Sequence, residues 1–294
     1  MTNLIETHQT FRFAPLGECM YCGSKENLSD EHIIPYALSG TLVLPQSSCD
    51  SCAVITSKIE RSVLRGFMFD ARVVGNFPSR RKRDRPESLK TKVLSADDTI
   101  VEKEVGVSES PAFLILPTFG PATLLNGQPP VLGIHIVGQE TLHFGKDVGD
   151  FVREHGAKGI QFGSNVEATE LAQLLAKIAY GYLVAQMGQF PREETPLLRL
   201  IRGEADDGGC WVGSSDYKLQ IEEKRPRHAL GIVPIQNTQG AQGFVVRVKL
   251  FADSGCTGYE VAVRVPGWQV CRPTRRSSGR LRRPLALRRG CGKT

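Results

Sequence analysis

Several features common in membrane, secreted and nucleotide-using proteins are missing from this 294-residue sequence. No uninterrupted apolar run approaches the roughly 20 residues that a membrane-spanning helix needs. The amino terminus, MTNLIETHQTFRF, lacks the basic start and long apolar core of a secretory signal, so we expect a cytoplasmic protein. Between about residues 95 and 270 there is no P-loop and no glycine-rich nucleotide fingerprint. We also find no internal repeat in the sequence.

A secretory context, which a disulfide framework would need, is missing as well. The chain has eight cysteines, and an intracellular protein keeps its thiols reduced. Four of them form two CxxC pairs, and the other four show no recognisable spacing and are interpreted as buried or free thiols. These last four are Cys210, Cys256, Cys271 and Cys291.

Positive charge is unevenly distributed along the chain. The formal net charge is +6, but the segment 272–294 carries nine Lys and Arg residues and no acid, so the rest of the chain has a net charge of −3. A second basic segment, 58–92, has eleven Lys and Arg residues against four acids. It includes Arg80, Arg81, Lys82 and Arg83, which are candidates for contacts with nucleic-acid phosphates. A solvated surface loop is an equally good interpretation of this run.

The patterning predicts an α+β chain in which a small module with the two CxxC pairs comes first and a mixed α+β domain follows. A helix is expected over 166–187, where apolar residues recur at spacings of three and four. Alternating apolar residues on both sides of 253–258 predict a β-hairpin, and the apolar runs near 113–116 and 131–137 predict strands. The expected divisions are a module at 1–75, a basic linker at 76–95, a domain of unknown role at 96–270 and a disordered basic tail at 271–294.

The two CxxC pairs predict a structural zinc site. Cys19, Cys22, Cys49 and Cys52 can supply four thiolates in a tetrahedron, and a CxxC turn is tight enough to aim both of its sulfurs at one point. A redox-active CxxC would be expected in a thioredoxin-like βαβ context, which is absent here. A zinc with four protein ligands holds structure and performs no chemistry.

The residues between the cysteine pairs carry a resemblance to a known family. The order CxxC, Glu31-His32-Ile-Ile-Pro35, CxxC and then a helix resembles the HNH endonucleases, and in particular their zinc-stapled ββα-metal members. The resemblance covers about residues 17–62. It implies that His32 is the general base for phosphodiester hydrolysis and that Glu31 binds a catalytic divalent ion, Mg²⁺ or another metal.

The same resemblance shows where this sequence departs from the family. The Asn that usually follows the last cysteine and helps to hold the metal is replaced by Ala53, which has no ligand atom. Glu60 lies on the same expected helix face and is the best replacement, because hard cations prefer carboxylates. The family's polar residue on the second strand has no evident match. Adjacent residues of a regular strand point to opposite faces, so Glu31 and His32 require a distortion to act together.

Three functions remain open from the sequence. The first is a metal-dependent endonuclease, for which we favour DNA over RNA as the substrate. The second is a catalytically silent, zinc-stabilised module that binds nucleic acid, an alternative that Ala53 favours. The third is a protein-interaction module, for which the mildly acidic body gives modest support. The region 96–270 carries no interpretable motif and could serve a protein partner.

Overall fold

The computed structural model describes residues 10–80, 82–163, 165–215, 227–236 and 240–265, so Arg81 and the predicted basic tail lie outside the described residues. Its helices are α1 (Asp50–Arg65), α2 (Phe69–Val74), α3 (Val148–Glu154), α4 (Ala168–Met187), α5 (Leu198–Ile201) and α6 (Gly208–Trp211). Its strands are β1 (Phe11–Arg12), β2 (Leu28–His32), β3 (Leu42–Cys49), β4 (Ser88–Leu94), β5 (Ile100–Gly106), β6 (Pro111–Phe119), β7 (Ile136–Gly145), β8 (Gly159–Gln161), β9 (Val212–Ser215), β10 (His228–Gln236), β11 (Gln242–Leu250) and β12 (Gly258–Arg264).

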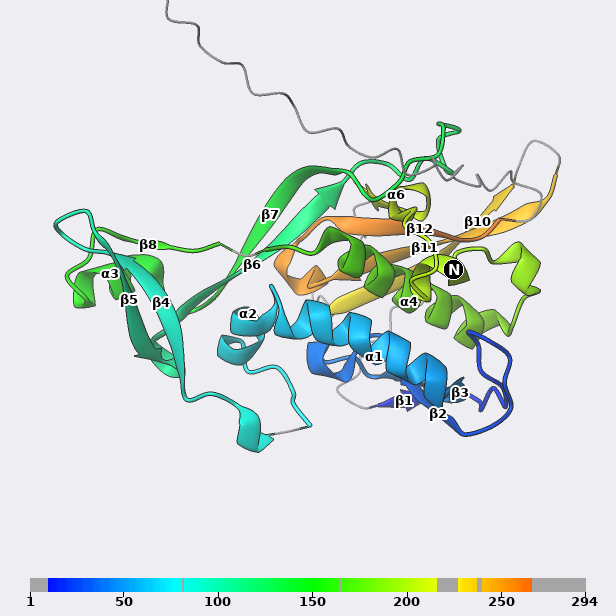
Figure 1. The fold of residues 1–294 in the computed structure, drawn as a ribbon, viewed down its shortest axis with the longest axis horizontal. Coiled ribbons are helices and arrows are strands. Elements are labelled where there is room, and N and C mark those ends of the chain that lie inside the picture. Colours follow the sequence, from blue (N-terminus) through cyan, green and yellow to red (C-terminus); the bar gives the residue numbers. More distant parts are fainter. Residues whose placement is uncertain (1–9, 81, 164, 216–226, 237–239, 266–294) are drawn as a thin grey trace, which may run out of the picture.

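The first structural element is a ββα unit, which we define as β2, β3 and α1 (Figure 1). Strands β2 and β3 pair antiparallel, and β1 adds a short parallel strand on the other edge of β3. The register between β2 and β3 shifts between Ser29 and Glu31, so β2 is distorted just before the Glu31-His32 pair. Helix α1 begins directly after β3. Asp50 lies in its first turn, where a negative charge interacts favourably with the helix dipole and stabilises the helix.

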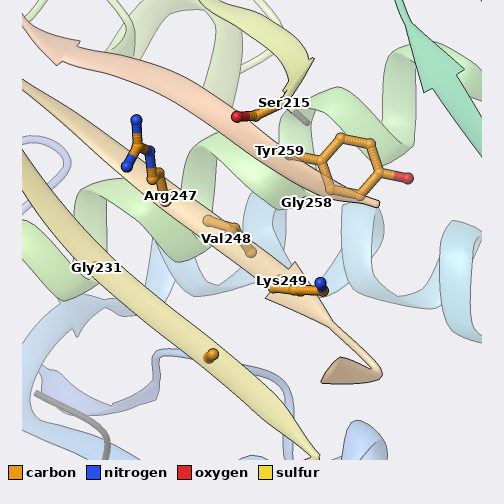
Figure 2. Close-up of a pocket in the computed structure, with 8 residues that line it drawn as sticks. Ser215, Gly231, Arg247, Val248, Lys249, Gly258 and Tyr259 are labelled. Carbon is orange, nitrogen blue, oxygen red and sulfur yellow. The ribbon is translucent and has the colours of Figure 1, made fainter. Parts of the chain in front are cut away.

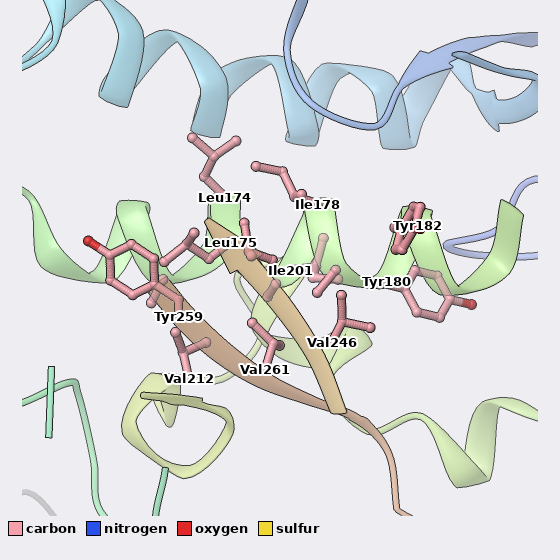
Figure 3. Close-up of a cluster of buried hydrophobic side chains, with 14 of the residues drawn as sticks. Leu174, Leu175, Ile178, Tyr180, Tyr182, Ile201, Val212, Val246, Tyr259 and Val261 are labelled. Atoms are coloured by element: carbon pink, nitrogen blue, oxygen red, sulfur yellow. The ribbon is translucent and has the colours of Figure 1, made fainter. Parts of the chain in front are cut away.

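Helix α4 is the centre of the molecule. It lies between α1 and the antiparallel sheet β10-β11-β12-β9. Leu174 and Ile178 of α4 point toward α1, and Val246 of β11 and Val261 of β12 lie on the other side of α4 (Figure 3). The sequence shows a single apolar stripe on this helix, yet the residues from 171 to 184 are buried with the sole exception of Gln173. Contact with α1 on one side and the sheet on the other accounts for burial all round the helix axis.

Strands β4 to β8 and helix α3 form the part of the molecule that extends away from α4 (Figure 1). Strands β6 and β7 form a long antiparallel hairpin, which leads to a small sheet of order β5-β4-β8 with α3 beside it (Figure 1). Val93, Val105 and Phe151 are the buried residues of a separate small apolar cluster in this region. Strand β4 falls within the segment that was predicted to be a linker.

The prediction of an α+β chain with an amino-terminal ββα unit is confirmed, as are the helix at 166–187 and the hairpin formed by β11 and β12. The predicted domain boundaries stay predictions. One continuous buried cluster joins the ββα unit to α4 and to the sheet behind it. Among the described residues, no helix is both long enough and apolar enough to cross a membrane.

Candidate functional site

The four cysteines of the two CxxC pairs come together at one end of the ββα unit. The sulfur atoms of Cys19, Cys22, Cys49 and Cys52 all lie within 4.8 Å of one another, and those of Cys22 and Cys49 are 3.5 Å apart. A tetrahedral zinc with thiolate bonds of the usual length separates its sulfurs by about 3.8 Å. The residues present therefore fit a zinc ion, and all four of its positions would be filled by the protein.

Local backbone structure explains why the sulfurs converge. In the first pair, the amide of Gly23 donates a hydrogen bond to the carbonyl of Cys19, and Gly23 has a φ of +77°, which suits glycine. A side chain at Gly23 would also collide with the guanidinium of Arg192. In the second pair, Cys49 precedes α1 and Cys52 lies in its first turn, where the positive end of the helix dipole stabilises thiolates.

Glu31 and Glu60, the two predicted metal ligands, converge on one point. That point is the ammonium group of Lys177, which reaches across from α4. Its Nζ lies 2.6 Å from a carboxylate oxygen of Glu31 and 2.5 Å from one of Glu60, and it also donates a 2.8 Å hydrogen bond to the carbonyl of His32. The Lys177 side chain is 1% exposed, that of Glu31 10% and that of Glu60 26%.

A divalent ion does not fit between these carboxylates while Lys177 holds them. A metal ion bound by Glu31 and Glu60 would take the position of the ammonium, or would lie against it and be repelled by it. Ala53 supplies no ligand, and the hydroxyl of Thr56, one turn along α1, donates to the carbonyl of Ala53. The assignment of a catalytic ion to Glu31 and Glu60 stays a prediction, and the Lys177 contacts weigh against it.

His32 has different neighbours from Glu31. Its ring lies 5.8 Å from the ring of exposed Tyr36, and the guanidinium of Arg80 lies 5.8 Å from the centre of that tyrosine ring. Burial, followed by the positive charges of Arg80 and Lys177, lowers the pKa of His32. The imidazole is therefore neutral near pH 7 and able to accept a proton. Its Nδ1 is buried and has no hydrogen-bond partner among the described residues.

The acid next to Glu31 has a structural partner. Asp30 forms an ion pair with Arg12 at 2.5 Å and accepts a hydrogen bond from the amide of Gln46, and the Arg12 contact is the main reason why the pKa of Asp30 is lowered. Asp30 thus joins β1 to β2 and β3 and is not directed at the Glu31–Glu60 pair.

The basic segment 58–92 divides into structural and exposed cations. Arg72 donates to the carbonyls of Ala37 and Leu64, and Arg85 donates to the carbonyls of Arg72 and Val73 at the end of α2. By contrast, several other cations of this segment are exposed to solvent. They are Lys58, Arg61, Arg65, Arg80, Arg83, Lys90 and Lys92. Lys82 begins a short helical turn. Arg81, which was also predicted to contact phosphates, lies outside the described residues.

A shallow pocket lies elsewhere, on the sheet β10-β11-β12-β9 (Figure 2). Its lining includes Ser215, Gly231, Lys249 and Arg247, and the guanidinium of Arg247 is engaged by Glu260 at 2.7 Å. Figure 2 views the outer face of the sheet, with α4 and α1 behind it. The pocket brings together no group of acids, histidines or cysteines, so it offers no second candidate for a catalytic centre.

Comparison with known proteins agrees with the geometry of the ββα unit. Residues 19–68 match a family model described as HNH endonuclease, which confirms the resemblance seen in the sequence. The match begins at Cys19, includes β2, β3 and α1, and ends before α2. No curated protein and no solved structure matches the chain significantly. Residues 19–68 therefore resemble an HNH endonuclease domain, and the four clustered cysteines of this segment could hold a zinc ion.

Lys177 is the residue of this site that the sequence did not reveal as functional. It lies more than a hundred positions beyond the last residue of the family match, and its only signal in the sequence is a charged side chain amid the apolar residues of a predicted helix.

Proposed function

We propose that this protein binds nucleic acid on the surface that carries His32, at the end of β2 in the ββα unit, together with Tyr36 and Arg80. The observation behind the proposal is that Tyr36 and Arg80 gather next to His32, the strand-end histidine of a segment that matches the HNH endonuclease model. An exposed aromatic ring beside a guanidinium suits a nucleic acid, because the ring can stack on a base while the cation contacts a phosphate.

Further cations on α1 support the same ligand. Lys58, Arg61 and Arg65 are exposed and follow one another at spacings of three and four, so they share one face of the helix. No ion pair is found for any of them among the described residues. Cations without acidic partners are available to replace the counterions of a phosphate backbone, which makes the binding salt-dependent.

Hydrolysis of the nucleic acid by a metal-dependent endonuclease, with DNA preferred to RNA, is the second candidate function. The family match favours it, and the neutral imidazole of His32 could accept the proton of an attacking water. The zinc of the cysteine cluster would only hold the fold, because no coordination position remains open. A catalytic divalent ion would have to bind elsewhere than in the present Glu31–Glu60 arrangement, or displace Lys177 from it.

Binding is tested by fluorescence anisotropy with labelled duplex DNA, single-stranded DNA and structured RNA, over a range of salt concentrations. We expect affinity to fall steeply with salt, and the Arg80→Ala and Arg61→Ala variants to bind several-fold more weakly. On duplex DNA, the slope of log affinity against log salt should be shallower by about 0.9 for each phosphate that a variant no longer neutralises. Lys90→Ala is the matched control, because Lys90 is an exposed cation on β4, outside the ββα unit. Equal affinity for the wild type and all three variants would refute this surface.

Cleavage is tested on plasmid DNA and structured RNA with Mg²⁺, Mn²⁺ or EDTA, after metal analysis has confirmed bound zinc. Cleavage that requires added metal and disappears in His32→Ala would establish the second candidate, since His32 is not a zinc ligand and the variant should keep its fold. Binding without cleavage, by folded and zinc-loaded protein, would leave the first candidate as the function.

A further inference from the structure

Lys177 occupies a position where a charged side chain is unexpected. It lies in the middle of α4, and the residues on both sides of it in the helix are buried. Lysine is almost never fully buried unless it is paired, because an isolated ammonium loses its hydration there. A specific set of partners must therefore hold it in place.

Those partners account for the whole hydrogen-bonding capacity of the ammonium group. Its three N–H donors match three acceptors, namely the carboxylates of Glu31 and Glu60 and the carbonyl of His32. Burial alone would lower the pKa of Lys177, but the two carboxylates outweigh burial and hold the pKa above its usual value. The group is therefore charged at neutral pH.

The origin of the three side chains is informative. Glu31 comes from β2 and Glu60 from α1, the two elements of the HNH-matched segment whose carboxylates would be expected to share a cation. They do share one, but it is supplied by a helix outside that segment. The His32 carbonyl at 2.8 Å fixes the ammonium at the end of β2, directly beside the predicted general base. The ammonium therefore has the position of a bound ion, while its covalent tether belongs to the other half of the chain.

We propose that Lys177 permanently takes the cation position between Glu31 and Glu60, so that this HNH domain binds nucleic acid without a catalytic divalent ion. The proposal rests on the nucleic-acid-binding function for its biological meaning, but its physical claim concerns the protein without nucleic acid. A tethered ammonium supplies one positive charge and no open coordination position, so it neither binds nor polarises a water as a metal ion would.

The first test is a Mn²⁺ titration of full-length, zinc-loaded protein, followed by the electron paramagnetic resonance signal of free Mn²⁺. We expect the wild type to bind no Mn²⁺ at Glu31 at concentrations up to about 1 mM. Its Mn²⁺ binding curve should therefore be the same as that of Glu31→Gln. Lysine-selective NMR provides a second readout, in which the Lys177 ammonium resonance should remain unchanged when Mg²⁺ is added. A stoichiometric Mn²⁺ site in the wild type that is lost in Glu31→Gln, or a Lys177 signal displaced by Mg²⁺, would overturn the proposal.

The second test removes the ammonium. Lys177→Ala leaves the carboxylates of Glu31 and Glu60 without their shared cation, so we expect a Mn²⁺ site that binds at least tenfold more tightly than any in the wild type. The double variant Lys177→Ala/Glu31→Gln should lose that site. A folded, zinc-loaded Lys177→Ala protein that gains no site would contradict the view that the ammonium fills a cation position. If Lys177→Ala does not fold, the wild-type titration still decides.

These measurements use no nucleic acid, so their outcome is independent of the binding assay. A wild type that binds Mn²⁺ at Glu31 would refute the lysine proposal and leave nucleic-acid binding intact. A wild type that binds neither Mn²⁺ nor nucleic acid would refute the proposed function, while Lys177 would keep its assignment as the internal cation.

Discussion

Replacing Lys177 by methionine should destabilise the protein strongly, because it leaves a carboxylate buried without its counter-charge. Methionine matches the length of the lysine stem, so packing within α4 is largely preserved. Glu60 is 26% exposed and can be rehydrated, whereas Glu31 is only 10% exposed and cannot. Breaking a buried ion pair on one side costs about 3–5 kcal/mol, and we expect Lys177→Met to lower the free energy of unfolding by that amount near pH 7.

The destabilisation should depend on pH in a defined direction. Burial already raises the pKa of Glu31, and removing Lys177 takes away the main interaction that lowers it. A carboxyl whose pKa is higher in the folded state than in the unfolded state costs stability as pH rises through that window. The difference between Lys177→Met and the wild type should therefore shrink as the pH is lowered toward 5. The double variant Lys177→Met/Glu31→Gln should recover most of the stability.

Urea unfolding followed by circular dichroism measures these differences. A matched control is Lys158→Met, because Lys158 pairs with Asp98 at 2.7 Å but both side chains are well exposed. Exposed pairs contribute about 0–1 kcal/mol, so this variant should unfold almost like the wild type. If Lys177→Met costs no more than Lys158→Met, the buried network does not exist in solution and the account of Lys177 is refuted.

Two further predictions concern the zinc and an internal histidine. Metal analysis should find one zinc per chain, and Cys49→Ser should lose the zinc and unfold the ββα unit, which proteolysis or amide exchange would detect; a zinc-free protein with an unchanged fold would contradict this. His228 donates from Nε2 to the carbonyl of Leu38 and accepts the amide of Phe251, and burial lowers its pKa to about 4. The unfolded state therefore binds the proton of His228 more tightly than the folded state does. The free energy of unfolding should fall by up to about 3 kcal/mol as the pH drops from about 6.5 to 4. His228→Gln should make the free energy of unfolding depend less on pH over this range.

The sequence was most informative where chemistry and spacing act locally. Two CxxC pairs predicted the cysteine cluster, because a metal site of this kind forces residues near in sequence into one geometry. The resemblance to the HNH endonucleases implied the ββα unit. Helix α4 and the hairpin of β11 and β12 were also predictable from their apolar periodicity. Each of these features depends on contacts within one element or between neighbours in the chain.

The partner of Glu31 and Glu60 could not be predicted in the same way. Lys177 is separated from Glu60 by 117 positions, and a single charged residue in an apolar helix does not indicate which element it will face. The periodicity of α4 was correct, but its burial on all sides depends on the arrival of α1 and of a sheet formed by the last strands. His228 contacts Leu38 across 190 positions and is equally invisible without the tertiary structure.

Joining the cation covalently to the fold changes how its site responds to the surroundings. The occupancy of a metal site follows mass action, so it varies with the free ion concentration and can be emptied by a chelator. The Lys177 ammonium cannot leave the site by diffusion, because it is part of the chain. Its local concentration is set once, by folding. The surface around His32 would therefore keep the same electrostatic character through any fluctuation in cellular magnesium, and a chelator would act on this protein only at the cysteine cluster, by withdrawing a zinc ion bound there.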